Sequence, residues 1–260
     1  MMSSPAVSKE QKKDKKFLLI VIAASCLVAA MFGSRNSLSL TIEGIDQSQT
    51  LNYLQISFAF ALGQLVVGAI SPFAGMIADK YGSGKTLTVG ILLGLLGIIL
   101  IPYSTTAFTL SISLGVISSI GLGVAGLPVV LASVNRLIPQ NKVGMAFGLV
   151  NAGQSLGQLI LAPLAGFIIV NFGWILCILF LCTVLLLVLP FSFTLRSRTD
   201  TKQPSGVQTK SLSETLRIAF NTPSYIYLVA GFFVCGFHVA FIATHMPGVI
   251  QVCGLPPTVS

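Results

Sequence analysis

Arg35 is the residue in this chain whose type and position most clearly point to binding chemistry. It lies inside a long apolar stretch, residues 17–42, and a charge at the centre of a bilayer costs about 2.5–3.5 kcal/mol on insertion scales. A guanidinium group binds a carboxylate through two parallel hydrogen bonds, so Arg35 is a candidate ligand for an anionic substrate. The alternatives are that Arg35 extends to the outer lipid headgroups or pairs with Glu43.

Neutral polar side chains and histidines also occur inside apolar stretches. Spacings of three and four residues place side chains on one face of a helix, and the candidates for lining a polar path are Gln64, Asn151, Gln154 and Gln158. Such residues also hydrogen-bond between packed membrane helices, and both interpretations stay open. His238 could take up a coupling proton near neutral pH, or it could be a neutral imidazole bonded to a neighbouring helix.

The remaining reactive side chains give no sign of catalysis. The five cysteines show neither C-x-x-C nor Cys/His spacing that would suit zinc, and no covalent chemistry is implied. We therefore expect no cofactor, no metal and no enzymatic activity.

A short charged turn, residues 75–86, separates two apolar runs. Its defining residues are Gly75, Asp79, Lys80, Gly82 and Lys85. We expect Asp79 to act in a conformational switch and not in substrate binding. The alternative is a carboxylate that is simply solvated in a loop.

The composition places these residues in a membrane protein. The chain is 54% hydrophobic and 8% charged, against roughly 25% charge in soluble domains. A spanning helix needs about 20 apolar residues, and seven stretches qualify: 17–42, 51–77, 86–104, 107–134, 143–170, 174–193 and 223–248. The net charge of +8 lies mostly in the connectors, so we expect a lipid bilayer and no nucleic acid as partner.

The basic residues occupy alternate connectors. With the N-terminus in the cytoplasm, every lysine and arginine outside the spans falls on the cytoplasmic side, as the positive-inside rule requires. We predict a cytoplasmic tail over residues 1–16, six helices over 17–193, a cytoplasmic linker over 194–222 and a seventh helix within 223–260. We expect a monomeric, multi-pass protein of the plasma (inner) membrane.

Helices two and five repeat one pattern. LGQL occurs at 62–65 and 156–159, and P-x-A-G occurs at 72–75 and 163–166, followed in each copy by an aromatic residue and glycine. The copies cross the bilayer in opposite directions, which predicts two inverted three-helix units, an architecture of secondary transporters. The alternative is coincidence, because glycine and proline are common in membrane helices.

The charged turn resembles the signature G-x-x-x-D-[RK]-x-G-x-[KR]-[RK] of the major facilitator superfamily. The resemblance implies an all-α general-transporter fold of twelve helices in two halves, of which this chain holds the first half and helix seven, 223–260. We therefore expect a truncated transporter. The resemblance also implies that Asp79 holds an inner gate shut, with Arg136 as the available basic partner. Helices one, five and seven look most like bacterial members related to monocarboxylate and oxalate:formate carriers.

These observations predict a secondary active transporter that moves a small organic anion by alternating access. A proton or a counter-substrate is the expected coupling partner. The alternatives are a carrier for a sugar or drug-like solute and a fragment that does not transport. A seven-helix photoreceptor is disfavoured, because the seventh stretch contains no lysine for a retinal Schiff base.

Overall fold

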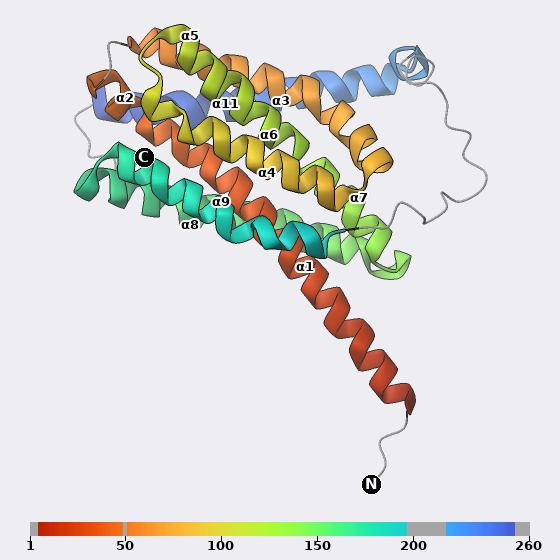
Figure 1. Ribbon diagram of the computed structural model, residues 1–260. Coiled ribbons are helices and arrows are strands. Elements are labelled where there is room, and N and C mark those ends of the chain that lie inside the picture. Colours follow the sequence, from red (N-terminus) through yellow and green to blue (C-terminus); the bar gives the residue numbers. More distant parts are fainter. Residues whose placement is uncertain (1–4, 49–50, 197–216, 253–260) are drawn as a thin grey trace.

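The computed structural model describes residues 5–48, 51–196 and 217–252, with side chains described at 14–42, 44–46, 51–196 and 217–242. Within these ranges the chain is helical and contains no strand (Figure 1). The long helices are α1 (Pro5–Leu38), α3 (Tyr53–Tyr81), α4 (Ser83–Ile99), α8 (Val143–Phe172), α9 (Trp174–Thr194) and α11 (Pro223–Val252). Short helices η1 (Ser39–Thr41), α2 (Ile42–Ser48), η2 (Ile101–Tyr103) and η4 (Gln140–Lys142) lie at their ends.

Seven helical segments of the described chain are long and apolar enough to cross a membrane. They cover 14–41, 53–81, 83–103, 107–137, 140–172, 174–194 and 223–242. The prediction of an all-α fold with seven spanning segments is therefore confirmed. Most of the predicted linker, residues 197–216, lies outside the described residues.

The first helix is longer than the apolar pattern indicated. We predicted a start at residue 17, whereas α1 begins at Pro5 and projects beyond the other helices (Figure 1). The added residues include five lysines, one glutamate and one glutamine, which are good helix formers, so the helix does not end where the apolar run ends.

The fourth span is not one continuous helix, and that expectation was wrong. It consists of α5 (Ala107–Leu110), the π-helix η3 (Ser111–Ser118), α6 (Ser119–Val124) and α7 (Leu127–Leu137). Pro128 has no N–H to donate and its ring would meet the carbonyl four residues earlier, at Val124. The helix accordingly ends at Val124 and restarts at Leu127.

Among the six N-terminal spans, the other four pack around α1 and the fourth span. The α1 helix contacts α8 and α9, and α4 contacts α6, η3 and α9, while α3 packs against η3 and α6. Glycines permit these close approaches, since a Cβ on Gly157 would collide with the backbone of Ala29, and one on Gly121 with the backbone of Gly94. Such small-residue contacts replace the hydrophobic driving force that is missing between helices in lipid.

Two glycines turn the chain at equivalent points of the repeated pattern. Gly82 joins α3 to α4 with φ 91° and ψ 138°, and Gly173 joins α8 to α9 with φ 87° and ψ 164°. Each amide donates to the carbonyl four residues earlier, at Ala78 and at Ile169. Only glycine adopts this backbone readily. The repeat seen in the sequence thus corresponds to the same helix–turn–helix geometry.

Three helices keep most of their surface exposed. In the most apolar 18-residue window of each helix, the buried share is only 22% for α3, 22% for α8 and 0% for α11, compared with 56% for α1. The α11 helix contacts only η1 and α3 to any extent among the described elements, and it runs along the outside of the bundle (Figure 1). These helices present large apolar faces, with Leu65, Leu159 and Phe232 among the exposed side chains.

Candidate functional site

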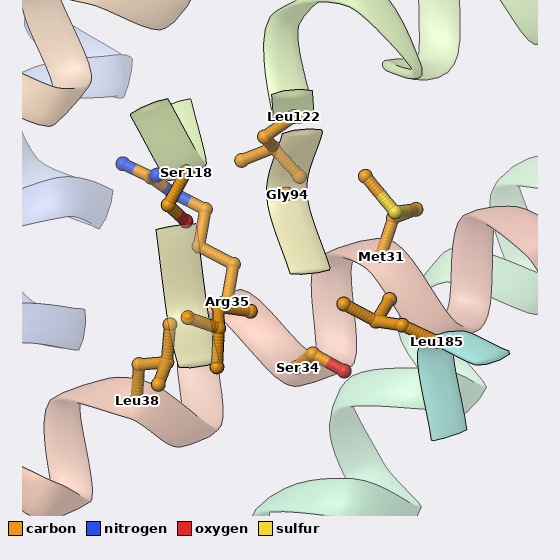
Figure 2. Close-up of a pocket in the computed structure, with 9 residues that line it drawn as sticks. Met31, Ser34, Arg35, Leu38, Gly94, Ser118, Leu122 and Leu185 are labelled. Atoms are coloured by element: carbon orange, nitrogen blue, oxygen red, sulfur yellow. The ribbon is translucent and has the colours of Figure 1, made fainter. Parts of the chain in front are cut away.

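Arg35 lies near the C-terminal end of α1, half-buried, in a small pocket inside the six-helix bundle. The lining residues come from α1, α4, η3, α6 and α9 and are Met31, Ser34, Arg35, Leu38, Gly94, Ile98, Ser118, Leu122 and Leu185. Figure 2 shows the Arg35 side chain running from α1 toward Ser118. The cavity is about 20 Å³, which is room for about one water molecule.

The polar groups in this pocket are sparse. Among the described side chains Arg35 has no ion-pair partner, and the side chain of Glu43, the alternative partner, is outside the described set. Ser34 is 1% exposed, and its Oγ has no hydrogen-bond partner in the described chain. Because the other lining residues are mostly apolar, the guanidinium group of Arg35 is the dominant charge of the pocket.

The π-helix contributes its last residue, Ser118, to the lining of the pocket. Ser118 lies so close to α4 that a Cβ on Gly97 would collide with the Ser118 backbone. The Oγ of Ser119 donates to the carbonyl oxygen of Leu114 at 3.1 Å, a spacing of five residues. π-helical turns are rare and often occur at functional sites. Sequence reasoning missed Ser34 and Ser118, although the glycines Gly94 and Gly97 signalled a close helix contact.

The structure does not gather the other predicted substrate residues around Arg35. None of Gln64, Asn151, Gln154, Gln158 and His238 lines its pocket. Gln64 is exposed on α3, and the Asn151 side-chain amide donates to the carbonyl oxygen of Phe147 in its own helix at 2.9 Å.

Gln154 and Gln158 are half-buried on α8, and the Oε1 atom of Gln154 is buried without a hydrogen-bond partner in the described chain. The exposed His238 ring contacts the Val234 carbonyl oxygen of its own helix at 2.8 Å, and not a neighbouring helix as the alternative interpretation had it.

The charged turn carries an ion pair between two helix ends. Asp79, near the end of α3, accepts a hydrogen bond from the guanidinium of Arg136, in the last turn of α7. Their side chains are 50% and 34% exposed. Lys80 instead lies over the Tyr81 ring, 5.2 Å from its centre, and Lys85 is exposed. A Cβ on Gly75 would meet no atom within 4 Å.

A second ion pair lies at the same end of the bundle. Lys142 donates to Asp14 at 2.8 Å and lies 5.2 Å from the centre of the Phe17 ring. Arg136 and Lys142 lie at the two ends of the connector between α7 and α8. Their ion pairs therefore link that connector to both α3 and α1. Sequence reasoning missed this pair, because it counted Lys142 only as a marker of topology.

The family model described as Major Facilitator Superfamily matches residues 20–260. The chain belongs to the Major Facilitator Superfamily. This agrees with the resemblance carried by the charged turn and with the seven spans.

Transporters are also among the relatives with curated names. The riboflavin transporter RibZ of Clostridioides difficile is 28% identical over 162 residues, covering 62% of this chain and 35% of that protein. Monocarboxylate transporter 11 of Mus musculus is 25% identical over 178 residues, covering 68% and 39% respectively. The chain spans about a third to a half of the length of the curated relatives it matches.

A solved transporter structure supports the fold. The crystal structure of a bacterial homolog of the human lysosomal transporter Spinster, in an inward-facing and unoccupied conformation, matches with a TM-score of 0.71. The match covers 94% of this chain and 57% of that one at 16% identity. At this identity the likeness establishes the fold alone.

Proposed function

We propose that this protein is a secondary active transporter that moves a small organic anion of the monocarboxylate type by alternating access. The observation that supports the proposal is Arg35, a half-buried cation in a mostly apolar pocket within the spanning bundle, with no ion-pair partner among the described side chains. Monocarboxylate transporters are among its relatives.

The energetics of a membrane interior favour an anion at Arg35. A cation at the bilayer centre carries an insertion cost of about 2.5–3.5 kcal/mol, which is the upper bound for Arg35 nearer the end of its span, and removing it from water without a partner is destabilising. A carboxylate would offset this cost through charge-assisted hydrogen bonds. The hydroxyl groups of Ser34 and Ser118 line the same pocket and could donate to it.

The small size of the pocket fits a site that is closed in this arrangement. A cavity of about 20 Å³ cannot hold a monocarboxylate, so the helices around Arg35 would have to separate for binding. We infer that the exposed faces of α3, α8 and α11 pack against the remaining helices of a twelve-helix carrier, and that rocking between the halves opens the site. His238, on the exposed α11, which is the first helix of the second half, would lie among those remaining helices and is our candidate for proton coupling.

We further infer that the pair of Asp79 and Arg136 stabilises the closed inner end. It joins α3 to α7 at the cytoplasmic side expected from the positive-inside distribution, and Asp79 carries the family signature. The proposal includes the N-terminus in the cytoplasm and a place in the plasma membrane.

Uptake of a monocarboxylate such as lactate into proteoliposomes tests the anion proposal. The full-length protein would be compared with Arg35→Gln and Arg35→Lys, with Arg217→Gln as the matched control, since Arg217 is exposed. Hydrogen bonds to charged groups contribute about 1.5–3 kcal/mol, so Arg35→Gln should lower uptake by about 10- to 150-fold. The lysine variant should retain part of the activity.

Two results would contradict the proposal. Unchanged lactate uptake by Arg35→Gln would remove Arg35 from the substrate site. Transport of riboflavin or a neutral sugar by the unmodified protein, with no carboxylate uptake, would favour the alternative substrate classes.

A further inference from the structure

An apolar groove runs between α1 and α9 at the end of the bundle where α1 projects, separate from the Arg35 pocket. It is lined by Lys15, Leu18, Leu19 and Ile22 of α1 and by Phe191 and Thr194 of α9. Its volume is about 440 Å³, within the range of about 300–1,000 Å³ that ligand sites occupy. The transport proposal makes no use of this groove.

The α1 wall of the groove is a continuous apolar stripe with a cation at one end. Positions 15, 18, 19 and 22 lie on one helical face, and Leu18, Leu19 and Ile22 are 56%, 57% and 49% exposed. At 1.5 Å per residue the stripe extends about 10 Å along the helix. It belongs to the first membrane span, 14–41, so its apolar part lies against lipid chains and Lys15 at the level of the headgroups.

Lys15 keeps its charge available. It forms no ion pair among the described side chains, and the neighbouring acid, Asp14, accepts a hydrogen bond from Lys142. None of the residues lining the groove is acidic. A neutral lipid would satisfy the apolar stripe and leave the ammonium group without an anion, whereas an anionic headgroup would satisfy both.

We propose that the groove between α1 and α9 binds an anionic phospholipid, with an acyl chain along Leu18, Leu19 and Ile22 and the headgroup phosphate at Lys15. The site requires neither a substrate nor an open inner gate, so it is independent of the transport proposal.

Quenching by lipids with brominated chains tests this site in the 260-residue chain. The sole tryptophan, Trp174, would be changed to phenylalanine and the reporter Phe191→Trp introduced in the groove. The protein would be placed in phosphatidylcholine vesicles that contain a minor fraction of brominated phosphatidylglycerol or the same fraction of brominated phosphatidylcholine. The ratio of quenching gives the relative occupancy by the two lipids.

We expect phosphatidylglycerol to be preferred about fivefold, since one lysine near an anionic surface contributes about 1 kcal/mol. Lys15→Gln should abolish this preference. Lys16→Gln, which removes the adjacent exposed lysine that does not line the groove, should retain it. Equal quenching by both lipids would overturn the proposal. Equal loss of preference in the two variants would also overturn it, because it would show a diffuse surface attraction and no site.

Discussion

The ion pair of Asp79 and Arg136 should contribute a modest, measurable coupling energy to closure of the inner face. Its side chains are 50% and 34% exposed, so the pair belongs with surface salt bridges, which contribute about 0.2–1 kcal/mol. A buried pair would instead lose about 3–5 kcal/mol when broken. The expected coupling corresponds to a change of about 1.4- to 5-fold in the equilibrium between closed and open inner faces.

A double-mutant cycle of Asp79→Asn, Arg136→Gln and the double variant measures this coupling in the full-length protein. The reporter is the rate at which a maleimide labels Gly144→Cys, because Gly144 is exposed near the start of α8 and a Cβ there meets no atom within 4 Å. The background replaces Cys26, Cys235 and Cys253 with serine and leaves the buried Cys177 and Cys182 in place.

Each single variant should label faster, and the second substitution should add little to the first. Arg217→Gln is the matched control, since Arg217 is exposed and lies outside the charged turn. A coupling energy of zero would refute the role of the pair in closure. Asp79→Asn should also slow exchange with little loss of substrate affinity, and a loss as large as that of Arg35→Gln would place Asp79 in the binding site instead.

Two further predictions concern the glycines. Gly82→Ala and Gly173→Ala should each lower the free energy of unfolding by about 1–3 kcal/mol, because both positions have positive φ; thermal unfolding in detergent should show similar losses, and a neutral effect at either would contradict the assigned turn. Gly121→Ala should lower the free energy of unfolding by about 1–3 kcal/mol, because the added Cβ would collide with the Gly94 backbone. Gly144→Ala, in open space, should be neutral or slightly stabilising. Equal effects at the two positions would contradict the close α4–α6 contact.

The spans were predictable because a membrane helix is set by local properties. Length and apolar content decide whether a segment crosses the bilayer, and all seven segments were found with ends shifted by a few residues, apart from the extended start of α1. The turn at Gly82 was visible for a similar reason, since its motif is short and contiguous. The break at Val124 was not predictable from Pro128 alone, because Pro72, Pro163 and Pro190 lie inside the uninterrupted helices α3, α8 and α9.

The Arg35 pocket could not be assembled from sequence, because its walls come from segments far apart in the chain. Arg35 and Leu185 meet only after α1 packs against α9, and the π-helical register that brings Ser118 there has no sequence signature of its own. The pair of Asp14 and Lys142 spans 128 positions of sequence. The roles assigned to Gln64, Gln154 and Gln158 stay predictions, because these residues lie on helices whose surfaces are largely exposed in this chain.

The matching turns at Gly82 and Gly173 have the same backbone geometry but differ in the charge of the residues before them. The two ends of the six-helix unit have almost the same backbone geometry, with the same turn and the same amide-to-carbonyl hydrogen bond. What distinguishes one end is chemical: Asp79 and Lys80 precede the first turn, and Val170 and Asn171 precede the second. The direction in which such a unit faces would then depend on the charged side chains of its connectors and not on the geometry of its turns. Evolution or protein engineering could reverse it by moving charges, without redesigning the scaffold.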